Sequence, residues 1–160
     1  MRKFRITIAL CVIMAFVVPF PETFAVSADS LQYTHFVYLF GHASWLHYII
    51  NVWTLLVLHN LLRWYRVLTA YLWSVLLSYI LLPDLPMVGL SVFNCFFIGF
   101  AAPWLWRRDR MTVILTMCLL LLTCVVSGFA GVQHVASFGF GVVFCLGEWK
   151  IRSLREYIRN

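Results

Sequence analysis

The sequence predicts an all-α polytopic membrane protein, with six transmembrane helices forming one domain over residues 1–160. Three observations lead to this fold class. Hydrophobic residues make up 63% of the chain and charged residues only 11%, and the mean hydropathy is +0.90. Soluble domains contain about 25% charged residues, so this chain has too little polar surface to face water. The apolar residues also form long blocks, and the basic residues all lie between alternate blocks.

The blocks predict six spans joined by short polar or turn-forming segments. The predicted spans are residues 5–20, 42–62, 67–82, 87–106, 111–130 and 132–149. The predicted joints are Pro19–Ser30, Arg63–Arg66, Pro83–Pro86, Arg107–Arg110 and a turn at Gly131. Because one span needs about 20 residues, no room is left for a soluble domain, a nucleotide-binding module or a repeat array.

The positions of the basic residues predict the topology. All twelve Lys and Arg residues lie before the first block, between blocks two and three, between blocks four and five, or after block six. The other joints contain Glu22, Asp29 and Asp84 and no positive residue. The positive-inside rule then places both termini in the cytoplasm. The basic C-terminal stretch, residues 150–160, is expected on the membrane surface, and no nucleic-acid partner is expected.

The first block has a second interpretation. Its basic start, its apolar run and the small-residue pattern Ala25–Ala28 also describe a cleavable signal peptide. A retained span is favoured because it completes the alternation of charge. The five cysteines all lie within apolar blocks and form no CxxC pair, so we expect packing residues, with no disulfide, metal or cofactor.

Polar side chains gather at the start of the second, fourth and sixth spans. His42, His47 and Asn51 open the second span, Ser91 opens the fourth and His134 opens the sixth. The predicted topology runs these three spans from the outside inward, so their first turns share one depth near the outer surface. Polar groups are costly in hydrocarbon, and such a layer is therefore a candidate site.

Helical spacing sorts the second span further. His47 and Asn51 are i,i+4 neighbours and are expected to act as a donor pair facing the site. His42 is about 140° from His47 around a helix, so it is expected to point elsewhere and to bond a loop as a structural residue.

Two stripes of small residues predict a close helix pair. The stripes are Ser91, Cys95, Gly99 and Ala102 on the fourth span and His134, Ser137, Gly141 and Cys145 on the sixth. Small residues let helices approach closely in lipid, and packing the stripes together would place Ser91 beside His134. Hydroxyl and imidazole together can perform nucleophilic catalysis, with Asn and His donors for an oxyanion. The layer holds no carboxylate, so a dyad is expected. The simpler alternative is that both stripes are only packing faces.

These residues resemble the motifs of the rhomboid family of intramembrane serine proteases. The family has His-x4-His-x3-Asn on one span, Gly-x-Ser on another and a later His. Here these are His42, His47 and Asn51; Gly89 and Ser91; and His134, with Gly99 and Gly141 also matching. The match extends from about Phe40 to Leu146.

The resemblance implies a six-helix bundle with a Ser–His dyad in an outward-facing cavity of the cell membrane. Ser91 would attack the scissile carbonyl, and His134 would act as base and then acid. His47, Asn51 and the Ser91 backbone amide would hold the oxyanion. The substrates would be transmembrane segments of other proteins in the bilayer.

The chain departs from the family pattern at three positions near the dyad. Val92 replaces a glycine after the serine, Cys95 replaces an aromatic residue, and Ser137 replaces a glycine after the base. The Trp-Arg motif of the first outer loop is also missing. Val92 and Cys95 support a second hypothesis, a rhomboid-like pseudoprotease that binds transmembrane clients without cleaving them. A third is a small transporter that uses the His cluster as a relay.

Overall fold

The computed structural model describes residues 7, 8, 11, 12, 14–16, 18, 20–27, 29, 31–81, 87–127 and 129–159. Over these residues the prediction of an all-α fold is confirmed. The elements are α2 (Pro21–Phe24), α3 (Thr34–Val37), η1 (Tyr38–Phe40), α4 (Trp45–Val57), η2 (His59–Leu61), α5 (Trp64–Ile80), α6 (Ser91–Arg108), α7 (Arg110–Ser127) and α8 (Phe129–Arg159). Here η denotes a 3₁₀ helix.

Five of the predicted spans overlap the long helices α4 to α8, and α8 extends past its span at both ends. In the first predicted span, the described residues 7, 8, 11, 12, 14 and 15 are helical. The predicted turn at Gly131 is wrong, because α7 ends at Ser127 and Gly131 already lies within α8. The C-terminal stretch is not a separate segment, since α8 continues without a break to Arg159. The predicted joint Pro83–Pro86 lies outside the described residues.

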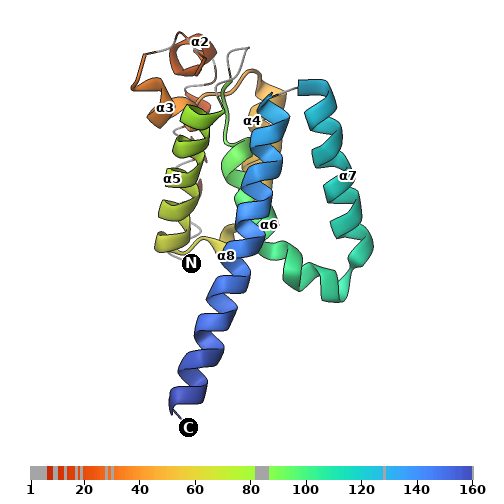
Figure 1. Cartoon of the computed structure of the whole chain (residues 1–160). Coiled ribbons are helices and arrows are strands. Elements are labelled where there is room, and N and C mark those ends of the chain that lie inside the picture. The colour runs from red at the N-terminus through yellow and green to blue at the C-terminus, as the bar shows by residue number, and fades with distance from the viewer. Residues whose placement is uncertain are drawn as a thin grey trace.

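The long helices alternate in direction around a central α6 (Figure 1). The first residues of α4, α6 and α8 lie at one end of the bundle, which we call the upper end after its place in Figure 1. Helices α5 and α7 run the opposite way, and α8 extends well below its neighbours (Figure 1). A helix of 31 residues is about 46 Å long, which explains this extension.

The closest helix pair is α6 with α8, and glycines make the approach possible. A Cβ atom on Gly99 would collide with the backbone carbonyl of Phe138, and one on Gly141 would collide with the carbonyl of Phe96. At Gly139, by contrast, a Cβ would meet nothing within 4 Å. The prediction that the two small-residue stripes face each other is therefore confirmed.

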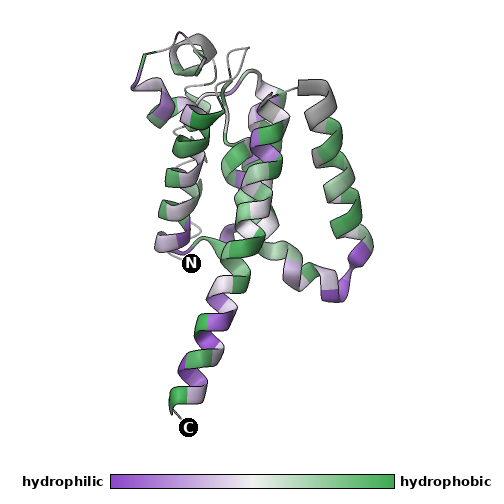
Figure 2. Cartoon of the chain, viewed as in Figure 1, coloured by the Kyte–Doolittle hydropathy of each residue, from purple (hydrophilic) through white to green (hydrophobic). Residues whose placement is uncertain are grey.

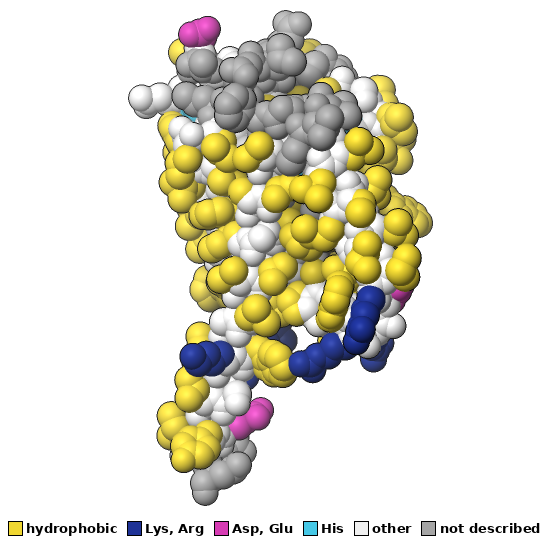
Figure 3. All heavy atoms as spheres, turned by 45° about the vertical axis from the view of Figure 1, so that its right-hand side comes forward, with side chains coloured by type: hydrophobic (Ala, Val, Ile, Leu, Met, Phe, Trp, Pro, Cys, Tyr) yellow, Lys and Arg dark blue, Asp and Glu magenta, His cyan; other side chains and the backbone are white. Residues whose placement is uncertain are grey.

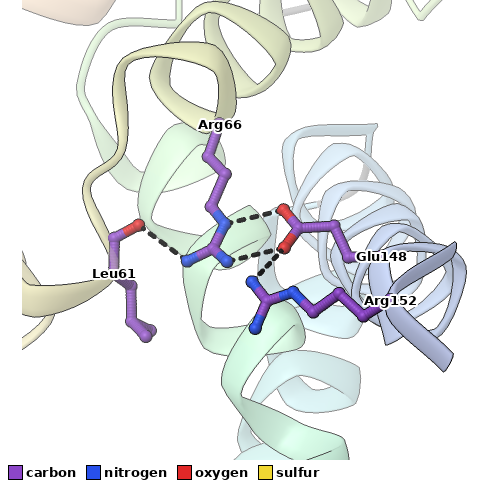
Figure 4. Close-up of polar contacts among 4 residues, drawn as sticks. All are labelled: Leu61, Arg66, Glu148 and Arg152. Atoms are coloured by element: carbon purple, nitrogen blue, oxygen red, sulfur yellow. Dashed lines mark hydrogen bonds and ion pairs between the residues drawn. The ribbon is translucent and has the colours of Figure 1, made fainter. Parts of the chain in front are cut away.

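An ion pair joins α5 to α8 at the lower end of the bundle. Arg66 donates from Nε and Nη2 to the two carboxylate oxygens of Glu148, at 2.8 and 2.7 Å, and from Nη1 to the carbonyl of Leu61 (Figure 4). Arg152, one turn further along α8, donates to the same carboxylate at 3.1 Å. The sequence placed Arg66 in a polar joint, but it is 5% exposed inside α5, because Glu148 neutralises it.

Hydrophobic residues predominate along the helices of the bundle (Figure 2), and apolar side chains cover much of the face seen in Figure 3. Trp53, Leu72 and Leu119, on three different helices, are each more than half exposed. Lys and Arg side chains gather below this apolar region, around the α6–α7 connection and the start of the α8 extension (Figure 3). Within the described residues, no helix combines the length and the apolar character that crossing a membrane requires.

Candidate active site

Ser91 and His134 meet at the upper end of the α6–α8 pair. Ser91 is the first residue of α6, and its Oγ lies 2.7 Å from Nε2 of His134 in α8. Both side chains are partly exposed. Among the described residues, the Ser91 hydroxyl has no second hydrogen-bond partner, so its proton is available to the imidazole.

A turn that contains a positive-φ glycine places Ser91 at the helix start. Gly89 has a φ of +122°, a backbone conformation that side chains rarely adopt. Its N–H donates to the carbonyl of Tyr38 at 2.9 Å, and the preceding Met87 pairs with Val26 through two 2.9 Å backbone hydrogen bonds. Val26 and Tyr38 thereby hold the turn before Ser91. Val26 belongs to the joint predicted over Pro19–Ser30.

Two further contacts hold α8 in register with the site. Ser137, one turn after His134, is fully buried and donates from Oγ to the carbonyl of Val92 at 2.7 Å. Gln133 is also fully buried, and its Nε2 donates to the carbonyl of Leu81. Val92 is itself 0% exposed. Val92 and Ser137, which both depart from the rhomboid pattern, are thus joined by a hydrogen bond from the Ser137 side chain to the Val92 backbone.

His47 lies directly beside the turn. A Cβ atom on Gly89 would be 2.5 Å from Cε1 and 3.0 Å from Nε2 of His47, so the imidazole covers this glycine two residues before Ser91. Ser44 caps α4 by accepting a hydrogen bond from the His47 backbone N–H at 3.2 Å.

The predicted orientation of His42 is wrong. Its ring is fully buried at a centroid distance of 5.4 Å from the ring of His47, and its Nδ1 lies 3.2 Å from the carbonyl of Phe40. Because α4 begins only at Trp45, residue 42 does not follow the helical spacing from which the orientation was predicted. His42 contacts the loop as expected, but it lies beside His47.

Asn51 is hydrogen-bonded to Asn94 of α6, a residue that was not predicted from the sequence. Its Nδ2 donates to the carbonyl of His47 at 2.9 Å, and its Oδ1 accepts from Nδ2 of Asn94 at 3.0 Å. Asn94 also donates to the Asn51 backbone carbonyl, and both side chains are 3% exposed. Asn51 and Ser91 make no hydrogen bond in the described part of the chain. Asn94, three residues after Ser91, could have been noticed as a polar residue in an apolar block.

The arrangement offers a hydroxyl, a base and hydrogen-bond donors, but no acidic partner. The second imidazole nitrogen of His134, Nδ1, is buried and has no hydrogen-bond partner among the described residues. The first backbone N–H groups of a helix also lack partners within it, and here these include the N–H of Ser91. No cluster of His, Cys, Asp or Glu that could hold a metal ion occurs in the described residues.

A second Ser–His pair also escaped the sequence analysis. His35 in α3 places Nδ1 2.9 Å from Oγ of Ser78 in α5, and its ring stacks on Tyr79 at a centroid distance of 3.9 Å. Ser78 is fully buried and its Oγ donates to the carbonyl of Val75 at 2.6 Å. This pair joins α3 to α5. No local periodicity marks it, because α3 has only four residues.

Comparison with known proteins adds no assignment to this geometry. Neither a family model nor a curated protein matches the chain. The function is therefore argued from the side chains around Ser91.

Proposed function

We propose that this chain is a rhomboid-type intramembrane serine endopeptidase that cleaves transmembrane segments of other membrane proteins. The observation that carries the proposal is the 2.7 Å contact between Ser91 Oγ and His134 Nε2 at the start of α6. It joins a hydroxyl that has no other described partner to a base on a different helix. A nucleophile and base within hydrogen-bond reach are the minimum for acyl transfer.

The chemistry proceeds in two halves. His134 Nε2 takes the Ser91 proton as Oγ forms a bond to the scissile carbonyl carbon, and the carbonyl oxygen becomes an oxyanion. The imidazolium then gives its proton to the leaving amine as the peptide C–N bond breaks, which leaves an acyl ester on Ser91. A water molecule, deprotonated by the same imidazole, attacks the ester. The acyl group leaves as a carboxylic acid and the proton returns to Ser91.

The oxyanion would be held by donors at the helix start. The Ser91 backbone N–H is unpaired within α6, and the His47 imidazole lies over Gly89 on the approach to it. Asn51 supports His47 by donating to its carbonyl, and its Nδ2 has a second hydrogen for the oxyanion. Aligned backbone donors at a helix N-terminus favour negative charge.

The membrane placement is a separate part of the proposal. It is supported by the 63% hydrophobic composition, by the exposed apolar side chains around the bundle and by the basic residues gathered at its lower end. The positive-inside rule would put that end and both termini in the cytoplasm, with Ser91 near the extracytoplasmic face. Resistance to carbonate extraction, and labelling of a cysteine placed at Asp84 from outside the cell, would test this. An externally accessible C-terminus would contradict it.

The alternative is a client-binding pseudoprotease, and one observation favours it. His134 Nδ1 has no described partner, and no aromatic ring among the described residues stacks on the imidazole. A base held only through Ser91 is less firmly oriented than one fixed from both sides.

Cleavage assays in proteoliposomes separate the two functions. The purified chain would be reconstituted with a panel of single-span membrane proteins whose spans contain helix-breaking residues near the outer end. The protease predicts cleavage within or beside the span that Ser91→Ala abolishes, with Ser78→Ala as the matched serine control. Capture of a client that stays intact, equally by wild type and Ser91→Ala, would support the pseudoprotease.

A further inference from the structure

An apolar cavity lies between α6, α7 and α8, at the end of the bundle opposite Ser91. Its volume is about 370 Å³, within the range of small-molecule and cofactor sites. The walls are formed by Ala102, Pro103, Val113, Met117, Phe138 and Val142. Trp106, Arg107 and Trp149 also line it, and each of these three is exposed. The cavity thus has an apolar interior and one cationic side chain at its border.

Arginine side chains stack on both of these tryptophans. The Arg107 guanidinium lies 4.6 Å from the ring centroid of Trp149, and the Arg110 guanidinium lies 5.8 Å from that of Trp106. Stacking holds a guanidinium through its face and leaves the N–H donors at its edge free for an anion. One guanidinium, that of Arg107, thus lines the cavity, and a second, that of Arg110, is held against a tryptophan that lines it.

These arginines are not neutralised by nearby carboxylates. In the described part of the chain, neither Arg107 nor Arg110 takes part in an ion pair. Asp109 lies between them, but its oxygens accept hydrogen bonds from the side chain and backbone N–H of Thr112, which hold the pKa of this carboxyl below its usual value. Glu148 is already shared by Arg66 and Arg152. The border therefore keeps a net positive charge.

We propose that this cavity binds an anionic phospholipid of the inner leaflet. One acyl chain occupies the apolar interior, and the phosphate contacts Arg107 and Arg110. Basic pockets between transmembrane helices on the cytoplasmic side select anionic headgroups, and tryptophan favours the headgroup level. This inference rests on the membrane placement in the proposed function but not on the chemistry of Ser91.

The test measures which lipid stays with the protein. The full chain is reconstituted in nanodiscs of nine parts phosphatidylcholine to one part phosphatidylglycerol, released by mild detergent and examined by native mass spectrometry. Wild type is expected to retain one phosphatidylglycerol in preference to phosphatidylcholine. The double variant Arg107→Gln/Arg110→Gln should lower this preference about 30-fold, because each surface arginine contributes about fivefold. The matched control, Arg63→Gln/Arg155→Gln, removes the same charge elsewhere and should keep it.

A second variant tests the cavity without changing charge. Val142→Phe fills the interior and should also lose the retained lipid, whereas Val143→Phe, at a neighbouring position that is 64% exposed, should not. Melting temperatures in pure phosphatidylcholine nanodiscs check that each variant is folded. Equal retention of both lipids by wild type, or no difference between either variant and its control, would overturn the proposal. Failure of the chain to enter nanodiscs would contradict the membrane placement itself.

Discussion

The described part of the protein contains two Ser–His contacts of similar length, and their hydroxyls have different surroundings. Ser91 and His134 are 2.7 Å apart between α6 and α8, and Ser78 and His35 are 2.9 Å apart between α5 and α3. Residue type and distance alone would not distinguish the proposed catalytic dyad from a structural link between helices. The surroundings of the two hydroxyls differ, and the proposal rests on this difference.

The difference lies in where each serine proton goes. Ser78 lies in the last turn of α5 and donates to the carbonyl of Val75, so its oxygen accepts from His35, and the imidazole cannot remove the proton. Ser91 begins its helix, where no preceding turn offers a carbonyl, and His134 is its only partner among the described residues. A serine within a helix commonly bonds its own backbone, and one at the first position is spared this.

The largest expected effect is the difference in proteolytic rate between His134→Ala and His35→Ala. His134→Ala should lower the rate of proteolysis by as much as about 10⁶-fold, because members of a catalytic unit each lose nearly the whole effect. His35→Ala should leave the rate little changed and instead lower the free energy of unfolding by about 1–3 kcal/mol, since it removes a buried hydrogen bond. Rates in proteoliposomes and thermal unfolding would be measured for both. Loss of activity on His35→Ala without unfolding would break the comparison.

Donors around the serine should produce the next largest effect. Asn51→Ala should lower kcat about 10²–10³-fold with little change in melting temperature, because it removes an oxyanion donor and the support of His47. Asn94→Ala should lower kcat less, since Asn94 acts through Asn51. His42→Ala, which removes a fully buried ring, should chiefly lower the melting temperature. Full activity of Asn51→Ala would remove it from the site.

A third variant alters the distance between Ser91 and His134 without touching either. Gly141→Val forces a side chain against the backbone of α6 and should reduce activity about 10²-fold, as expected for a misplacement of about 1 Å. Overpacking of this kind should also destabilise the fold by about 1–3 kcal/mol. Gly139→Val meets open space and is the control. Equal effects at both glycines would show that the α6–α8 approach does not set the dyad.

The smallest effect is a pH dependence of the structural pair. Burial lowers the pKa of His35 below its usual value near 6.5. At pH values between the lowered pKa of His35 in the folded protein and its usual pKa in the unfolded chain, the unfolded chain binds a proton that the folded chain does not. The free energy of unfolding therefore falls as the pH decreases below about 6.5, by at most about 1.4 kcal/mol per pH unit. Wild type should lose more stability than His35→Gln in unfolding experiments between pH 7 and pH 5.5. Parallel curves would contradict this.

Much of the α6–α8 pair could be predicted from the sequence. Small residues at helical spacing and basic residues at alternate joints determine which faces meet and in which direction the helices run. Ser91 begins α6 and His134 lies in the second turn of α8, on the facing stripes, so their approach follows from regular geometry. Spacing alone also assigned Gly141 to the contact face, where a Cβ would collide with α6.

The upper end could not be predicted in the same way. The contacts of Tyr38 with Gly89, of His35 with Ser78 and of Asn94 with Asn51 join segments more than 40 residues apart. Tyr38 and His35 lie in short helices without periodicity, whereas Asn51 and Asn94 join two long helices. The misplaced orientation of His42 has the same origin, since helical spacing was applied to a residue that precedes α4. Local pattern predicts helices and their faces, but not the long-range contacts that complete a site.

The most direct measurement is the position of covalent labelling by a fluorophosphonate, which reacts with activated serines. The folded protein in detergent would be treated with the probe, digested and mapped by tandem mass spectrometry, alongside Ser91→Ala and Ser78→Ala. The account predicts label on Ser91 in wild type and in Ser78→Ala, and none in Ser91→Ala. Labelling that persists in Ser91→Ala, or folded wild-type protein that takes no label at all, would contradict it.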